Sequence, residues 1–169
     1  KQKKQDGDSL NDKNPQQSEN KKNLGAYQEV QTQSKNRPFI HAYEIMSSPV
    51  KTLSQNHTVK DAINLMQKEG FRHIPILGNN ILVGIVSDRN LFSQNLTAQF
   101  LKTPLSLVMS KEVIVAKEHS EIKVLGNIML CEHISSLPII NEDNILQGIV
   151  TQTDLLNYMV QHMPIDFNI

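Results

Sequence analysis

The tetrapeptide Thr151-Gln152-Thr153-Asp154 brings a carboxylate and two hydroxyl side chains to a point where a predicted strand gives way to a helix. A carboxylate at such a junction can accept hydrogen bonds from the vicinal hydroxyls of a ribose, each worth about 1.5–3 kcal/mol. Thr151 and Thr153 could donate toward a phosphate, together with the amides of the first helical turn. The same spacing also forms a helix capping box, in which Thr151 and Asp154 bond only the backbone. The tetrapeptide alone favours capping, so its context in the chain has to decide.

A related tetrapeptide, Ser87-Asp88-Arg89-Asn90, occurs 64 positions earlier. Its serine matches Thr151, but Asn90 stands where the aspartate would be. Asparagine keeps an acceptor oxygen and lacks the charge, so its bonds to a diol should be roughly half as strong. The sequence therefore predicts two unequal sites, of which the first is weaker or degenerate.

Arg72 and His73 are the leading candidates for binding a phosphate. A guanidinium can bind a phosphate through two hydrogen bonds, an imidazole can add another donor, and Arg89 could assist. Ser135 and Ser136, 63 residues later, follow a similar pattern without the charge, so positive charge would come from one side of the site only. The alternative is that Arg72 and His73 form a solvated pair after the end of a helix.

The segments Ile74-Pro75 and Leu137-Pro138 suit an adenine ring, which needs a flat apolar slot and backbone groups for its edge. Proline has no amide hydrogen, so normal strand pairing is interrupted beside it and neighbouring backbone groups can face a ligand. The alternative is an edge strand whose aliphatic residues face the core. Both can hold, because alternate residues of a strand face opposite ways.

The chain contains an internal repeat, in which three short motifs recur in the same order 63 or 64 positions later. The pairs are Ile45-Met46-Ser47 with Val108-Met109-Ser110, Phe71–Ile76 with Ile134–Ile139, and Gly84-Ile85-Val86 with Gly148-Ile149-Val150. Each copy is too short to bury a good core alone, so we expect the two copies to pack on each other with approximate two-fold symmetry. The interface between the copies is then the natural place for a ligand.

Hydrophobic periodicity and turn residues predict the order β-α-β-β-α in each copy, and hence an α+β fold. In the first copy a strand at Val50–Leu53 precedes a helix capped by Thr58 and Asp61 and ended by Gly70. The remaining elements are strands at Ile74–Leu77 and Ile81–Val86 around a turn at 78–80, with a helix from about Asp88. In the second copy they are strands at Val113–Ala116, Leu137–Ile140 and Ile145–Val150, a turn at 141–144, and helices at Ile122–Leu130 and Asp154–Val160.

Composition sets limits on the class of protein. The 169 residues are 38% apolar, and 17 Lys and Arg are balanced by 17 Asp and Glu. This balance gives no overall basic field to bind DNA or an anionic membrane, and no apolar run is long enough to span a bilayer. The single cysteine, Cys131, excludes an internal disulfide, and its apolar helical surroundings predict a buried thiol. A reducing cytoplasm is the expected location.

Residues 1–36 are rich in Lys, Gln, Asn, Asp and Ser. Such a segment cannot bury enough apolar surface to offset its ordering entropy, which predicts a disordered tail or linker. The alternative is a short helix at Leu24–Val30 that docks on the folded part.

Catalytic and metal-binding functions are not indicated. The six histidines show no paired spacing typical of zinc ligands, and no nucleophile elbow, Walker loop or dinucleotide-binding glycine turn is present. We therefore predict that the chain is not an enzyme, has no metal site and requires no cofactor.

The repeated motifs resemble those of a tandem pair of cystathionine-β-synthase (CBS) domains, the arrangement often called a Bateman module. The opening Met-Ser, the hydrophobic-Pro-Ile step at Pro75 and Pro138, and the Gly-Ile-Val-Ser/Thr signature at Gly84 and Gly148 carry this resemblance. In the first copy, the segments Phe71–Pro75 and Ser87–Asn90 further resemble bacterial stand-alone CBS-pair proteins, including those named for acetoin utilisation. The resemblance implies regulatory binding of AMP, ADP or ATP in clefts between the copies, with S-adenosylmethionine or cyclic dinucleotides as further ligands. It also implies a disc-like homodimer and makes Asp154 the ribose anchor.

From these observations we divide the chain into a tail at 1–36, a first repeat at 37–104 and a second repeat at 105–169. The expected function is sensing of adenosine nucleotides by a population shift that an unidentified downstream protein reads. Two alternatives stay open: a structural or dimerisation module without a ligand, and a regulatory fragment of a larger transporter or enzyme. The predicted second site comprises Ile114, Ser136, Leu137, Pro138, Ile149, Thr151, Thr153 and Asp154. The predicted weaker first site comprises Thr52, Arg72, His73, Ile74, Pro75, Ser87, Arg89 and Asn90.

Overall fold

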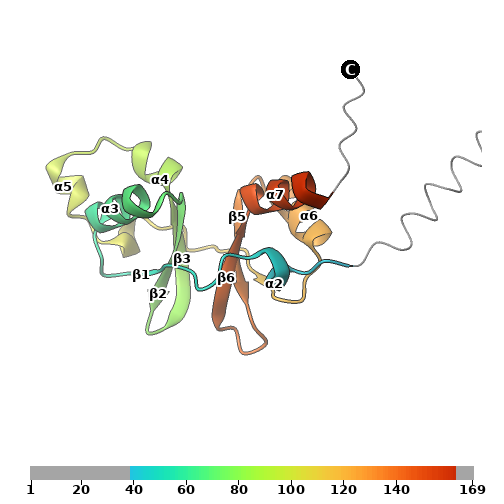
Figure 1. The fold of residues 1–169 in the computed structure, drawn as a ribbon. Coiled ribbons are helices and arrows are strands. Elements are labelled where there is room, and N and C mark those ends of the chain that lie inside the picture. The colour runs from blue at the N-terminus through green and yellow to red at the C-terminus, as the bar shows by residue number, and fades with distance from the viewer. Residues whose placement is uncertain (1–38, 163–169) are drawn as a thin grey trace, which may run out of the picture. The chain divides into compact units, whose positions relative to one another are not determined.

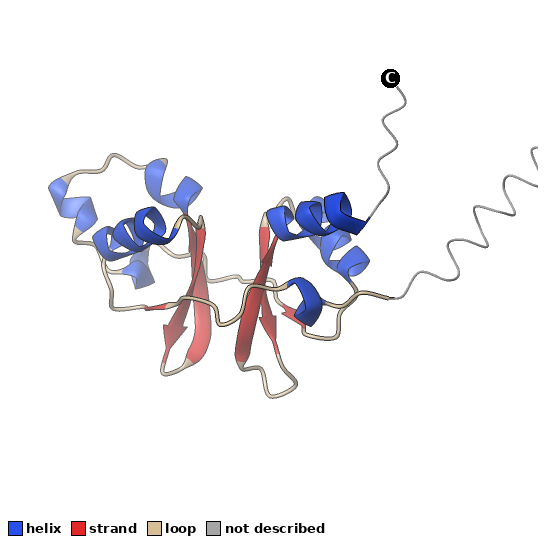
Figure 2. Ribbon diagram, in the orientation of Figure 1, coloured by secondary structure: helices blue, strands red, loops and turns tan. Residues whose placement is uncertain are grey.

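The computed structural model describes residues 39–162, in which the predicted α+β order occurs twice (Figures 1 and 2). The first series is β1 (Leu53–Ser54), α3 (Val59–Glu69), β2 (His73–Gly78), β3 (Ile81–Ser87) and α4 (Asp88–Phe92). The second is β4 (Ala116–Lys117), α6 (Ile122–Cys131), β5 (Ser136–Ile140), β6 (Leu146–Thr151) and α7 (Gln152–His162). A short α2 (Ala42–Ile45) precedes the first series, and α5 (Ala98–Leu101) and the 3₁₀ helix η1 (Leu105–Leu107) join the two. The predicted tail at 1–36 lies outside the described residues.

Each repeat contains a three-stranded sheet of the same topology. In the first, β2 pairs parallel with β1 and antiparallel with β3, and in the second β5 pairs in the same way with β4 and β6. The registers correspond across the repeat, since Leu53 pairs with Ile76 as Ala116 pairs with Ile139. The two repeats therefore share the strand order and the pairing register of their sheets, as well as the sequence motifs.

Local sequence signals set the boundaries of the first repeat's helix and hairpin. Thr58 accepts a hydrogen bond from the Asp61 amide and its own amide donates to the Asp61 carboxylate, as the capping box predicts. Gly70 ends α3 with a positive φ of 78°, a conformation that glycine adopts without steric cost. Asn79 and Asn80 have φ values of 50° and 65°, typical of a two-residue hairpin turn that matches the twist of its strands.

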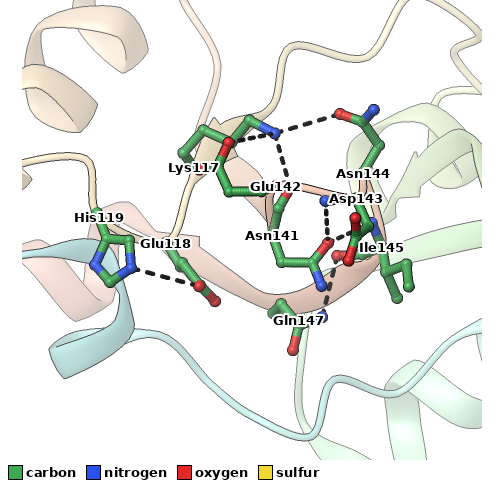
Figure 3. Close-up of polar contacts among 9 residues, drawn as sticks. All are labelled: Lys117, Glu118, His119, Asn141, Glu142, Asp143, Asn144, Ile145 and Gln147. Carbon is green, nitrogen blue, oxygen red and sulfur yellow. Dashed lines mark hydrogen bonds and ion pairs between the residues drawn. The ribbon is translucent and has the colours of Figure 1, made fainter.

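The longer turn of the second repeat is stabilised by side chains instead (Figure 3). The Asn141 Oδ1 atom accepts from the amides of Asp143 and Ile145, at 3.0 and 2.9 Å. The Lys117 ammonium group donates to the Asn141 carbonyl at 2.7 Å and lies 3.8 Å from the Glu142 carboxylate. One added residue in this turn accounts for the change of offset from 63 to 64 along the chain.

The opening strands differ from the prediction. They cover only Leu53–Ser54 and Ala116–Lys117, whereas Val50–Leu53 and Val113–Ala116 were expected. The preceding residues cross between the repeats instead: Ser47 bridges to Ile149 of the second repeat and Ser110 to Ile85 of the first. A strand prediction based on residue type could not detect this crossing, because the pairing partner lies in the other copy.

The two hydrophobic cores exchange parts in the same way. The first core packs α3 against β2 and β3, and it includes Leu105 with Val108 and Met109 against it, all from the segment that leads into the second repeat. The second core includes Ala42, with Ile45 and Met46 against it, from the segment that leads into the first repeat. We call these segments, residues 42–47 and 105–110, the leaders of the first and second repeat. Each core is completed by the leader of the opposite repeat.

The crossing gives a physical reason for a glycine at the same place in both copies, Gly84 and Gly148. A Cβ atom on Gly148 would lie 2.6 Å from the Met46 Sδ atom and 2.9 Å from the Ser47 carbonyl oxygen. On Gly84 it would lie 2.7 Å from the Met109 Cγ atom and 3.0 Å from the Ser110 carbonyl oxygen. Such distances are shorter than van der Waals contact, so only glycine lets the leader pass this close.

One predicted burial is wrong. Cys131, expected in the core, is exposed, because it lies at the C-terminal end of α6 on the side away from Leu125 and Met129. Leu91 of α4 is fully buried in the first core. Among residues 39–162, no helix has the length and apolar character that crossing a membrane requires.

Replacing Gly148 by alanine should lower the free energy of unfolding by about 1–3 kcal/mol, because the new methyl group overpacks the crossing at Met46 and Ser47. Gly126 is the matched control: it lies inside α6, and a Cβ there would be 3.8 Å from Leu155, an ordinary contact. Gly126→Ala should stabilise by roughly 0.5–1 kcal/mol through helix propensity. Urea unfolding of the two variants measures both effects, and equal stabilities would contradict this account of the crossing.

Candidate functional site

A cleft of about 1030 Å³ lies between the two repeats. Its walls are the ends of β3 and β6, the starts of α4 and α7, and the two crossing segments. Most lining residues have a counterpart in the other repeat that also lines the cleft: Ser87 and Thr151, Asn90 and Asp154, Ile85 and Ile149. The cleft therefore has two halves related by the repeat.

Seven of the eight residues predicted for the second site line this cleft, namely Ile114, Ser136, Pro138, Ile149, Thr151, Thr153 and Asp154. Leu137 does not, because it is fully buried in the second core. It alternates along β5 with Ser136 and Pro138, whose opposite direction places them at the cleft.

Five of the eight residues predicted for the first site line the cleft, namely Arg72, His73, Ser87, Arg89 and Asn90. Ile74 and Pro75 are fully buried. Thr52 is also absent from the lining, and its neighbour Lys51 takes that place.

Sequence reasoning missed Lys51 and Ile85, although a signal for both was available. Lys51 lies 63 positions before Ile114, and Ile85 lies 64 positions before Ile149. Applying the repeat offsets strictly to the predicted second site would have found both residues.

Asp154 combines the capping geometry with a position on the cleft. Its Oδ2 atom accepts from the amide and the hydroxyl of Thr151, each at 2.7 Å, while the Asp154 amide donates to the Thr151 hydroxyl at 3.3 Å. The other carboxylate oxygen, Oδ1, accepts no hydrogen bond from residues 39–162. The capping box therefore uses one oxygen of the carboxylate, and the second accepts no hydrogen bond from the described residues.

In Asn90, the counterpart of Asp154, both the side-chain oxygen and the side-chain nitrogen form hydrogen bonds within the protein. Its Oδ1 atom accepts from the Ser87 hydroxyl at 2.9 Å, and its Nδ2 atom donates to the Ser110 hydroxyl at 3.2 Å. The Asn90 amide donates to the Ser87 hydroxyl at 3.2 Å. The first half thus holds its polar side chain in a network within the protein.

Charge in the cleft is divided unequally between the repeats. All three Lys and Arg side chains of the lining belong to the first repeat: Lys51, Arg72 and Arg89. Their counterparts in the second repeat are the uncharged Ile114, Ser135 and Thr153. Arg72 lies 4.0 Å from the Asp88 carboxylate, a surface pair of small energetic value.

His73 connects the repeats across the cleft. Its Nε2 atom lies 3.0 Å from the Ser135 hydroxyl. Burial lowers the pKa of His73 below its ordinary value of 6.5, with smaller contributions from Arg72 and Arg89, while Asp88 opposes the shift. At neutral pH His73 is therefore an uncharged ring that hydrogen-bonds the second repeat, whereas the sequence suggested a phosphate donor.

With this geometry in place, comparison with known proteins identifies the family. The family model of the CBS domain matches residues 42–95 and again residues 105–161. The chain belongs to the CBS domain family. The predicted tandem pair is confirmed, with the two matches corresponding to the two repeats of the cleft.

Relatives include the CBS domain-containing protein YhcV of Bacillus subtilis, which is 32% identical over 66% of this chain and 80% of its own length. Among solved structures, a Vibrio cholerae protein named for acetoin utilization (AcuB) is 31% identical, with a TM-score of 0.67 over 73% of this chain and 93% of its own. The CBS domain pair of protein MJ0100, solved with 5′-methylthioadenosine and S-adenosyl-L-methionine, is 25% identical, with a TM-score of 0.66 over 73% of this chain and 98% of its own. Two uncharacterized proteins of Methanocaldococcus jannaschii also match, and the chain covers only 45% and 40% of their lengths.

The stability of the CBS pair should fall as pH is lowered from 7.5 to 5. Because the pKa of folded His73 lies below 6.5, the unfolded chain takes up the proton first and is favoured as pH drops through that value. His73→Gln keeps a hydrogen-bonding partner for Ser135 and should flatten this slope. Thermal unfolding across the range measures both proteins.

Asp61 does not interfere with that measurement. The hydrogen bond from the Thr58 amide lowers its pKa below 3.8, so its stabilisation is lost only in more acidic solution. An unchanged slope in His73→Gln would contradict the assignment of the pH dependence to His73.

Proposed function

We propose that the cleft binds an adenosine nucleotide or related adenosyl compound, and that the module is regulatory rather than catalytic. The observation that carries this proposal is the Asp154 carboxylate, which lines the cleft with one oxygen bonded to Thr151 and the other unengaged within residues 39–162. A carboxylate held in one orientation by its own helix cap is prepared to accept a hydrogen bond from a diol.

The ribose of the ligand would bind at the start of α7. Asp154 Oδ1 would accept from one ribose hydroxyl, and Thr153, exposed on the first turn, would add a further polar contact. A charge-assisted hydrogen bond of this kind contributes about 1.5–3 kcal/mol. The ring system would then extend over the apolar part of the lining.

Apolar side chains next to Asp154 support a site for the adenine. Ile114 and Ile149 line the cleft with Val113 and Pro138, and Ile114 is 38% exposed. Ordering a flat ring against these aliphatic surfaces removes apolar area from water, at about 25 cal/mol per Å². The exposed part of the Ile114 side chain would be covered by such a ring.

Lys51, Arg72 and Arg89 would receive the phosphates. Because they belong to the first repeat and Asp154 to the second, a nucleotide would bridge the repeats and favour one packing of the pair, which is a mechanism for regulation. Asp88, Glu112 and Asp154 balance these three cations, so the lining has no formal excess of charge to favour ATP over AMP. The complex of the MJ0100 pair with two adenosyl compounds supports the ligand class.

The wider role is also a proposal. From the sequence we propose a cytoplasmic location, a downstream protein that is not identified, and domain boundaries after residues 36 and 104. A regulatory part of a longer transporter or enzyme is the second role, and it fits the fraction of the two M. jannaschii proteins that the chain covers.

Replacing Asp154 by alanine should reduce affinity for AMP and ATP by at least about tenfold, because the charged acceptor for the ribose is lost. It should also cost about 0.5–2 kcal/mol of stability, because the capping box is lost. Asp154→Asn should separate the two effects by keeping an acceptor for Thr151 and removing the charge. Calorimetric titration and urea unfolding measure affinity and stability.

Asp61→Ala is the matched control for the loss of a cap. Thr58 donates to the Asp61 carboxylate through its amide at 2.8 Å and its hydroxyl at 2.7 Å, nearly the same geometry as in the Thr151 box, but Asp61 does not line the cleft. This variant should lose stability and keep its affinity. If Asp154→Ala binds as tightly as the unchanged protein, the ribose assignment is wrong and Asp154 only caps α7.

We also propose that the module forms a homodimer through the outer face of α7. Leu156, Met159 and Val160 are 59%, 45% and 57% exposed, more apolar surface than single scattered residues would leave in water. Leu155 packs inward against the second core, and Phe92 of α4 lines the cleft, so Leu156, Met159 and Val160 make up the proposed dimer face.

The double variant Leu156→Glu/Met159→Glu should weaken dimerisation by roughly 30-fold or more, since burying carboxylates in an apolar interface costs at least about 2 kcal/mol. Ile81→Glu is the control, because Ile81 is 64% exposed at the start of β3, in the hairpin rather than on the dimer face. Sedimentation velocity at increasing protein concentration measures the change. A monomeric unchanged protein at high micromolar concentration would remove the proposal.

A further inference from the structure

The first half of the cleft differs from the second in a hydrogen bond that spans the repeats. We infer that the bond from Asn90 to Ser110 closes the first half to a ribose, so that the chain binds one nucleotide tightly, at Asp154, and that Ser110 sets this stoichiometry. This inference rests on the proposed function, since it concerns how many nucleotides the same cleft accepts.

The backbone fixes the position of Ser110. Its amide donates to the Ile85 carbonyl at 2.9 Å, and its carbonyl accepts from the Ile85 amide at 3.0 Å. Ser110 also follows Met109 over Gly84, where a Cβ atom would have no room. The serine hydroxyl is therefore held beside the first turn of α4, where the Asn90 Nδ2 atom reaches it at 3.2 Å.

The second half has the same backbone and lacks the bond. Ser47, the counterpart of Ser110, exchanges both backbone hydrogen bonds with Ile149, at 2.9 and 3.2 Å. The Asp154 side chain has no N–H group to donate, and no hydrogen bond joins it to Ser47 within residues 39–162. The difference between the halves therefore comes from one amide in place of a carboxylate.

For a ribose to bind at Asn90, bonds already present would have to break. The Asn90 oxygen accepts from Ser87, and its nitrogen is committed to Ser110. The diol would also meet a neutral acceptor instead of a charged one. Together these differences should make the first half about tenfold weaker or more than the second.

The test is calorimetric titration of the whole chain with AMP and with ATP. The unchanged protein should bind one nucleotide per chain in the measured range. Ser110→Ala should reveal a second, weaker site, and Asn90→Asp/Ser110→Ala should give two sites of similar affinity, because the charged acceptor is restored and its competitor removed. Ser47→Ala is the matched control and should keep a stoichiometry of one.

A second measurement follows the bond without ligand. The Asn90 side-chain amide signals in nitrogen–proton correlation spectra should shift in Ser110→Ala and stay in place in Ser47→Ala. Unmoved signals in Ser110→Ala, two equal sites in the unchanged protein, or identical titrations of the two serine variants would each overturn the inference and leave the proposed function standing. No nucleotide binding by the unchanged protein would overturn the proposed function and this inference with it.

Discussion

The structure depends on two close crossings, of Met46-Ser47 over Gly148 and of Met109-Ser110 over Gly84. Each crossing brings a leader segment against the last strand of the opposite repeat and inserts its apolar residues into that repeat's core. The leaders then return to their own sheets through residues 47–53 and 110–116, and parts of both segments, at 47–51 and 110–114, form walls of the cleft. The cleft therefore exists because the leaders cross, and it is lined by both repeats because they cross in both directions.

Much of the fold could be predicted because its signals are local. The cap at Thr58, the stop at Gly70 and the asparagine turn after β2 are determined by a few neighbouring residues, and the repeat then transferred each element to the second copy. The opening strands could not be bounded in this way. The residues before these strands pair with the other repeat, Ser47 with Ile149 and Ser110 with Ile85, and residue type carries no information about those partners.

Residues of the candidate site could be predicted where the two copies have matching positions after their last strands. Prediction was poorer within the strands, where burial determines which side chains reach the cleft. Thr151, Asp154, Ser87 and Asn90 lie at the cleft as expected, since each follows its last strand directly. Ile74 and Leu137 were expected there and are buried, because alternation along a strand leaves only one face for a ligand. The properties of His73 depend on Ser135 and on burial, which are tertiary facts. For Asp154 the two alternatives that the sequence left open are compatible, since the capping box uses Oδ2 and leaves Oδ1 for the ligand contact that we propose.

The exchange of leaders has a consequence for how such a chain can arise. A single repeat with its own leader presents both a donor segment and an acceptor groove, and it is therefore complementary to a second copy of itself rather than to itself. Two separate copies would complete each other as a symmetric pair. Joining them in one chain replaces that bimolecular encounter by an intramolecular one, at the high effective concentration that a short connection provides. It also frees the two copies to diverge, as Asn90 and Asp154 have done on opposite sides of the same cleft.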